Sequence, residues 1–172
     1  GDLVWQHSFG GTGIERARDI AKTKDGGYVI TGSTFSTDVD ISENKGESDI
    51  WLIKIDGAGN LVWNKSFGGS QFDASESVIP SKDGGYIIAG NSKSNDGDTN
   101  VNVGENDIWL IKTDAKGNMV WQKSFGGNGL DYGFDAVETA GGAIVLVGES
   151  ASTDLSDMEN KGKSDMVIIK LK

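Results

Sequence analysis

An aspartate-rich segment in the middle of the chain carries the residues best suited to holding a metal ion. Oxygen-bearing side chains fall at positions 1, 3, 5, 7 and 12 of this segment, namely Asp96, Asp98, Asn100, Asn102 and Asp107. Calcium takes about six to eight oxygen ligands, and alternating Asp and Asn residues in a compact loop supply them. We therefore treat these five residues as a candidate calcium site. The alternative is that their side chains form Asx turns that shape the loop.

The spacing resembles that of an EF-hand loop but departs from it twice. Glycine stands at position 9 instead of position 6, and the last position is aspartate instead of glutamate. Two other loops keep part of the pattern, one with Asp38, Asp40, Ser42, Asn44 and Asp49, and one with Asp154, Ser156, Asn160 and Asp165. The later loop has Met158 where an oxygen ligand is needed. The recurring Asp49, Asp107 and Asp165 are interpreted as structural residues that accept backbone hydrogen bonds before a strand.

Other chemistry-bearing residues give little support for catalysis. Glu15, Asp73 and Asp131 occupy the same position after a Gly-Gly pair, where they either bind cations or sugar hydroxyls or cap a turn. Paired carboxylates suit a glycosidase, but such a site needs two acids in different environments, and these positions look alike. With His7 as the single histidine and no cysteine, a Ser-His triad, a His-based metal site and a thiolate site are disfavoured.

These residues recur because the whole chain is a threefold repeat. Trp5, Trp63 and Trp121 are 58 residues apart, and a Phe-Gly-Gly triplet follows each of them at the same distance. The pattern needs no insertion or deletion, so the sequence divides into repeats 1–58, 59–116 and 117–172 of one domain, 1–172.

Each repeat reads as four short strands. In the first repeat the expected strands are residues 3–9, about 17–23, 28–32 and 49–55, where β-branched and aromatic residues predominate. Glycine, asparagine and aspartate separate them, as in Asp25-Gly26-Gly27, which predicts a tight turn. Because no segment has a helical period, the sequence predicts an all-β fold of three four-stranded units.

Four strands joined by short turns are typical of a propeller blade. The segments 26–32, 49–56 and 59–69 resemble the last three strands of a blade in quinoprotein-type propellers. The longer pattern also resembles tandem repeats of secreted bacterial surface proteins that are predicted to be propellers. We therefore expect a β-propeller-like fold, with a three-fold β-trefoil or β-prism as the alternative. The Gln-x-Trp signature of trefoil lectins is missing.

The resemblance implies a role for each strand. The strand of Trp5 would be outermost in a blade, and the strand of Ala17 would line a central channel. The first strand of the chain would then complete the last blade and leave no sheet edge open. Three blades are fewer than the usual number of about four to eight. We therefore expect a head-to-tail homodimer of six blades or, alternatively, a piece of a longer array.

The net charge and the lengths of the apolar runs disfavour several classes of partner and a membrane span. A net charge of −10 disfavours nucleic acid and anionic membrane surfaces as partners, and no apolar run approaches the ~20 residues of a membrane helix. We expect a non-enzymatic binding or scaffolding module of an extracellular or cell-envelope protein, with a carbohydrate or protein ligand and calcium as the one candidate cofactor. The alternatives are a carbohydrate-binding, lectin-like module, in which tryptophans stack on sugars instead of packing between blades, and a fragment of a propeller hydrolase or quinone-dependent enzyme.

Overall fold

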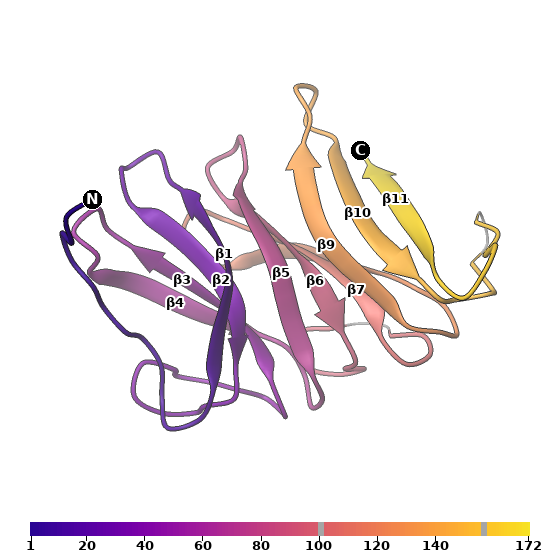
Figure 1. Ribbon diagram of the computed structural model, residues 1–172, viewed down its shortest axis with the longest axis horizontal. Coiled ribbons are helices and arrows are strands. Elements are labelled where there is room, and N and C mark those ends of the chain that lie inside the picture. The colour runs from indigo at the N-terminus through magenta and orange to yellow at the C-terminus, as the bar shows by residue number, and fades with distance from the viewer. Residues whose placement is uncertain (100–101, 156–157) are drawn as a thin grey trace.

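The fold is all-β, as the sequence predicts. The computed structural model describes residues 1–99, 102–155 and 158–172, and in these ranges it contains strands and no helix (Figure 1). The strands are β1 (Glu15–Lys22), β2 (Tyr28–Thr34), β3 (Asp49–Ile55), β4 (Leu61–Phe67), β5 (Asp73–Pro80), β6 (Tyr86–Ser92), β7 (Asp107–Thr113), β8 (Met119–Phe125), β9 (Asp131–Glu138), β10 (Ile144–Ser150) and β11 (Asp165–Leu171). Among the described residues, no helix is long and apolar enough to cross a membrane.

The strands form three antiparallel sheets that lie side by side in chain order (Figure 1). The first sheet is β1-β2-β3-β4, the second is β5-β6-β7-β8, and the third is β9-β10-β11. Strand β1 contacts β5, and β5 contacts β9, so the first strand of each sheet lies on the inner side of the row. The row of face-to-face sheets is propeller-like. The first two sheets each take their fourth strand from the next sequence repeat, whereas the third sheet has three strands.

The inner strands β1 and β5 contain shifts of register that the sequence did not predict. The register between β1 and β2 shifts between Ala17 and Asp19, and the register between β5 and β6 shifts between Ser75 and Ser77. Opposite the first shift, a Cβ on Gly32 would lie 1.8 Å from the carbonyl oxygen of Arg16. A glycine is therefore required in β2, because the bulged inner strand approaches its backbone.

Hydrophobic cores fill the two junctions between sheets. We call the face of a sheet that points to the next sheet its trailing face, and the opposite one its leading face. At the first junction, Ile50 and Leu52 of the trailing face pack against Trp109 of the second sheet. At the second junction, Ile108 and Leu110 pack against residues of the third sheet. These residues of the third sheet are Ala136, Ile144, Leu146 and Val167.

Trp63 and Trp121 pack at these junctions, which supports the packing interpretation of the repeated tryptophan over sugar stacking. Trp63 packs against the core of the first junction, with its ring 5.8 Å from that of Tyr86. Trp121 packs against the core of the second junction. A Cβ on Gly117 would lie 2.6 Å from the indole of Trp63, so this turn glycine leaves room for the ring.

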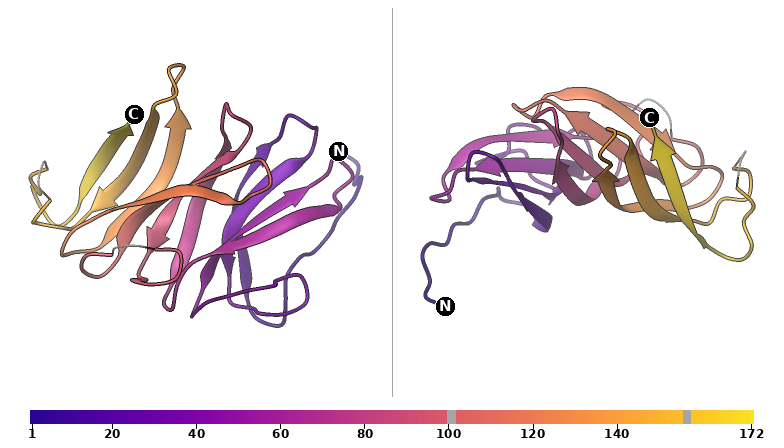
Figure 2. Two further views of the ribbon diagram at one scale, coloured as in Figure 1. Left: turned by 180° about the vertical axis from the view of Figure 1, so that it is seen from behind. Right: turned by 90° about the horizontal axis from the view of Figure 1, so that it is seen from above.

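The prediction of a strand at residues 3–9 is wrong for the single chain. Residues 1–10 have no strand structure, and the N-terminus and the C-terminus lie at opposite ends of the row (Figure 2). A strand needs a hydrogen-bonding neighbour, and the sheet edge at β11 that would receive this segment is at the far end. The first segment therefore does not complete the last sheet within one molecule.

Candidate functional site

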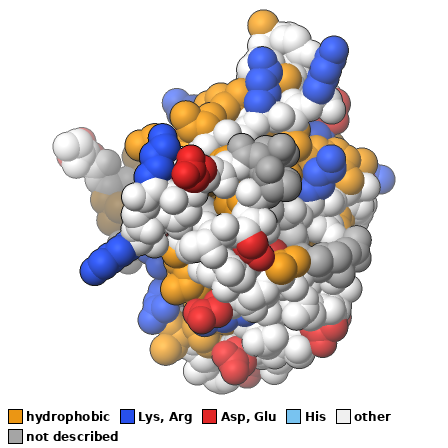
Figure 3. Space-filling view, turned by 90° about the vertical axis from the view of Figure 1, so that its right-hand side faces the viewer, with side chains coloured by type: hydrophobic (Ala, Val, Ile, Leu, Met, Phe, Trp, Pro, Cys, Tyr) orange, Lys and Arg blue, Asp and Glu red, His pale blue; other side chains and the backbone are white. Residues whose placement is uncertain are grey.

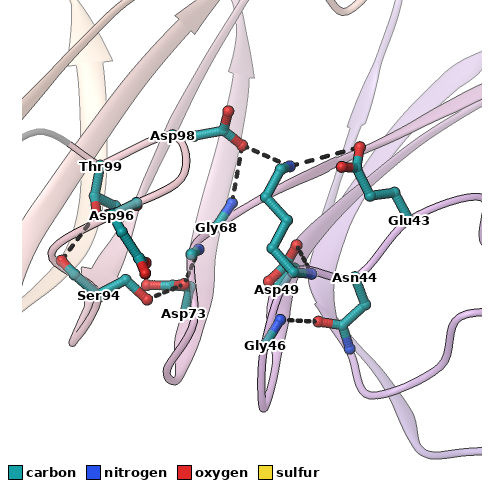
Figure 4. Close-up of polar contacts among 12 residues, drawn as sticks. Glu43, Asn44, Gly46, Asp49, Gly68, Asp73, Ser94, Asp96, Asp98 and Thr99 are labelled. Atoms are coloured by element: carbon teal, nitrogen blue, oxygen red, sulfur yellow. Dashed lines mark hydrogen bonds and ion pairs between the residues drawn. The ribbon is translucent and has the colours of Figure 1, made fainter.

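The first two residues of the candidate calcium site bind backbone groups of the neighbouring connection. The Oδ1 atom of Asp96 accepts a hydrogen bond from the N–H of Ser70 at 2.7 Å. The Oδ2 atom of Asp98 accepts one from the N–H of Gly68 at 3.1 Å (Figure 4). These bonds hold the turn after β4 on the loop between β6 and β7. Hydrogen bonding to Ser70 lowers the pKa of Asp96, which keeps this carboxyl ionised.

Asp98 also forms an ion pair with Lys45, a residue that the sequence analysis did not single out. The Nζ atom of Lys45, in the loop before β3, lies 2.9 Å from Oδ2 of Asp98 and 3.7 Å from Oε2 of Glu43. Burial lowers the pKa of Lys45, but the hydrogen bond and charge of Asp98 outweigh it, and the net shift is upward. The ion pair thus joins loops of the first and second sheets.

Two of the other predicted ligands, Asp107 and Asn102, bond to residues other than Asp98. Asp107 begins β7, and its Oδ2 accepts a hydrogen bond from the N–H of Val103 at 2.9 Å. Asn102 donates its own N–H to Oδ1 of Asn95 at 2.8 Å, and its side-chain oxygen is buried without a hydrogen-bond partner among the described residues. Asn100 lies outside the described residues. Within the described ranges, no group of three or more His, Cys, Asp or Glu side chains is placed to hold a metal ion.

The calcium site therefore stays a prediction, and it has a direct test. If the loop binds calcium, a millimolar concentration raises the Tm of the chain, because a ligand that binds only the folded state stabilises it. The double variant Asp96→Asn/Asp98→Asn should lose this rise, and EDTA should reverse it in the parent. Differential scanning fluorimetry measures the effect. An unchanged Tm in the parent at millimolar calcium would remove the site.

Repeated carboxylates dock each Gly-Gly turn onto the sheet that follows. Oδ2 of Asp73 accepts hydrogen bonds from the N–H of Gly69 and from Oγ of Ser94, both at 2.8 Å. Asp131 bonds Gly127 and Ser152 in the same way, at 3.0 and 2.7 Å. At the same position of the first repeat, Glu15 accepts the N–H of Gly11 at 3.0 Å. These acids are structural caps, in agreement with the turn-capping interpretation.

Two further carboxylates are buried where neighbouring sheets meet. Asp49 and Asp107 are almost fully buried, and the Oδ1 atom of each has no hydrogen-bond partner among the described residues. Burial, with a smaller contribution from neighbouring carboxylates, raises the pKa of each to about 6. A Cβ on Gly126 would lie 2.2 Å from Oδ1 of Asp107 and 2.8 Å from Oδ2 of Asp131, so this glycine separates the two acids.

A largely apolar pocket of ≈ 350 Å³ lies at the other end of the row, between the N-terminal segment and the leading face of the first sheet. Trp5, Trp51, Ile20 and Ile30 are among its lining residues. Trp5 is 38% exposed, whereas Trp51 is buried. Most of its lining is hydrophobic, and its polar lining residues are His7, Glu15, Arg16 and Thr31.

Comparison with known proteins gives a distant match and no family. No protein-family model matches it. It is 28% identical over 167 residues to the protein described as regulatory protein FlaEY of Caulobacter vibrioides. The match covers 90% of this chain but only 17% of that protein, so the chain spans less than a fifth of the curated relative that it matches.

Proposed function

We propose that this chain is a non-enzymatic binding or scaffolding module whose propeller-like row of sheets presents loops to a partner. The observation that carries the proposal is that the described parts of the long loops before β3, β7 and β11 lie with the Gly-Gly turns along one edge of the row, opposite the tight turns (Figure 1). Aspartates fix these loops to backbone N–H groups, as Asp38 does for Thr12 and Asp154 for Asn128. Loops on a rigid framework are a common place for binding residues.

Several features support a role without catalysis. One oxygen of each buried acid at the sheet junctions accepts a backbone N–H, as in Asp49 and Asp107. These acids repeat from unit to unit instead of taking the distinct roles that acid–base catalysis needs. Lys54 and Lys112 are buried too, but each is paired with an aspartate of a tight turn, at 2.9 and 2.8 Å. These groups stabilise the framework, which leaves the exposed loop residues to contact a protein or carbohydrate ligand.

The proposed setting is an extracellular or cell-envelope protein. Its support is the resemblance of the repeats to those of secreted bacterial surface proteins and of quinoprotein-type blades. The distant relative is described as a regulatory protein. We also propose that two copies of this chain join head to tail into a homodimer of six sheets, because the outer faces of the first and third sheets are unpacked in the single chain.

The loop edge can be tested by site-specific photo-cross-linking in the cells that make the protein. A benzophenone amino acid replaces Glu47 on the loop edge, or Ala58 in the tight turn at the opposite edge; both positions are exposed. Cross-links from position 47 to one envelope component, with few from position 58, are expected, and a glycan array identifies a carbohydrate. Equal labelling from both positions, or labelling of cytosolic proteins alone, would contradict the proposal.

A further inference from the structure

The third sheet exposes a face that is packed in the other two sheets. The positions of Ile108 and Leu110 on the trailing face of the second sheet are those of Met166 and Ile168 in the third. The former two are fully buried, whereas Met166 is 80% and Ile168 62% exposed. Figure 3 shows this end of the molecule, where hydrophobic side chains lie at the surface among charged ones. Among the described residues, no sheet therefore covers the trailing face of the third sheet.

The first sheet has the complementary vacancy. Its leading face carries Ile20, Ile30 and Trp51 at the positions where the second sheet has Val78, Ile88 and Trp109. The latter three residues form part of the core of the first junction. Their counterparts in the first sheet line the apolar pocket instead, and Ile20 is 56% exposed. The pocket thus lies where a trailing face would pack.

The N-terminal segment already lies where the outer strand of a preceding sheet belongs. The N–H of Gly10 donates to Oδ2 of Asp40 at 3.0 Å, as Gly68 does to Asp98 at 3.1 Å. The ring of Trp5 lies against the turn glycine Gly59, in the way that the ring of Trp63 lies against Gly117. The segment is therefore docked like β4 but has no sheet to pair with.

We infer that a second copy of this chain fills both vacancies by strand exchange. Its third sheet packs on the leading face of the first sheet, and its β11 pairs with residues Leu3–Phe9. The register follows from β3 and β4, where Leu52 pairs with Lys65 and Lys54 with Trp63. The residue of β3 is replaced by its counterpart two repeats later, and the residue of β4 by its counterpart one repeat earlier. The two pairs then become Ile168 with His7 and Lys170 with Trp5. The inference rests on the propeller-like module proposed above and assigns the residues that join two of them.

An ion pair at the junctions supports the same partner. Lys45 bridges to Asp98 at the first junction, whereas Val103 replaces the lysine at the second. Between the third sheet and the first sheet of another copy, the same positions hold Lys161 and Asp40. Lys161 is exposed, and among the described residues it makes no ion pair. The two ends of the chain are therefore complementary in charge as well as in hydrophobic surface.

Two copies joined in this way make a closed assembly. Each chain gives its first segment to the other, so the sheet edge at β11 is paired in both chains. The two vacant faces of each chain are covered as well. The interface is head to tail, and a head-to-tail contact either closes into a ring or continues as a filament. Six sheets fall within the range of about four to eight blades in closed propellers, so we assign the two-chain ring.

Disulfide trapping tests the register, because the chain has no cysteine of its own. The double variant His7→Cys/Ile168→Cys should form covalent dimers under mild oxidation, since directly paired strand residues lie within about 4.4–6.8 Å between Cα atoms. In the matched control Ser8→Cys/Ile168→Cys, the two side chains point to opposite faces of the sheet. We expect dimers from the first variant and few from the control. Equal yields from both variants would overturn the register.

A charged residue on the exposed face tests the packing without disturbing the single chain. Ile168→Asp should raise the Kd of the dimer on the order of 100-fold, because the junction buries this side chain. Val120→Asp introduces the same charge at another exposed position, 61% exposed on β8, and should leave the dimer intact. Analytical ultracentrifugation gives both values, and circular dichroism confirms the fold of each variant. A parent that stays monomeric at high micromolar concentration would overturn the inference.

The two proposals fail separately in these experiments. A monomeric parent that still cross-links to an envelope component through position 47 would refute strand exchange and leave the binding module standing. A dimer that traps in the expected register but gives no loop cross-link would support strand exchange and contradict the binding role.

Discussion

Replacing Trp109 with alanine is expected to lower the free energy of unfolding by about 3–5 kcal/mol, the usual range for a large buried aromatic residue. Trp109 is fully buried in the core of the first junction, and its Nε1 donates a hydrogen bond to Oε1 of Gln122 at 3.0 Å. The alanine variant loses the packing of two sheets and leaves a cavity between them. Urea unfolding followed by circular dichroism measures the change.

Trp5 provides the matched control. It is the same residue type in the same protein, but it is partly exposed and packs on the first sheet without a strand neighbour. Trp5→Ala should therefore cost less than a third of the Trp109→Ala loss in the monomeric chain. If both variants lost the same free energy, the packed junction between the first and second sheets would not be the main hydrophobic core.

The strands of this fold were largely predictable because the repeat fixes them three times. The expected strand 49–55 is β3 as observed, and the expected strand 28–32 lies within β2. The repeat also relates positions in the two cores: Val167 stands at the position of Trp109, and both residues are buried. The periodicity of hydrophobic residues carries this information locally.

What the sequence did not reveal depends on contacts between repeats. The segment at residues 3–9 has the composition of a strand, but strand structure requires a neighbour, and the single chain provides none. The bulges in β1 and β5 depend on how the inner strands approach one another. The pairing of Lys45 with Asp98 joins residues 53 positions apart, so it became visible only when the two loops were placed side by side.

The candidate metal ligands show the same limit. The spacing of Asp96 and Asp98 fits a cation loop, yet both carboxylates accept backbone hydrogen bonds from the turn after β4. One-dimensional spacing cannot distinguish a carboxylate that binds a metal from one that binds an N–H group, because both need an oxygen at the same place. The distinction comes from the neighbouring loop, which the sequence places more than twenty residues away.

The buried acid at the second junction gives an expected gain of stability. Asp107→Asn should stabilise the protein at pH 7 by about 1–3 kcal/mol, because its pKa of about 6 lies some two units above the ordinary value of 3.8 and each unit is worth about 1.4 kcal/mol. The asparagine carbonyl can still accept the N–H of Val103, and no charge remains to be buried beside Asp131. Thermal or urea unfolding measures the difference.

The pH dependence gives the sign of this effect independently. Below pH 3.8 the carboxyl is protonated in both the folded and the unfolded state, so it contributes no penalty. Between about pH 4 and pH 6 the folded state binds more protons, and the contribution of Asp107 to stability falls as pH rises. Above pH 6 the penalty is constant. The gain from Asp107→Asn should therefore be full at pH 7 and vanish near pH 4.

Asp114 is the control with the opposite sign. It lies in an exposed turn, and hydrogen bonding to Asn118 lowers its pKa. A lowered pKa means that ionised Asp114 favours the folded state, so Asp114→Asn should reduce stability at pH 7, and this loss should fade as pH falls toward the lowered pKa. If both Asp→Asn variants changed stability in the same direction at pH 7, burial of the Asp107 carboxylate would not be the cause. Opposite signs would establish that the fold accepts an unfavourable buried charge where its sheets meet.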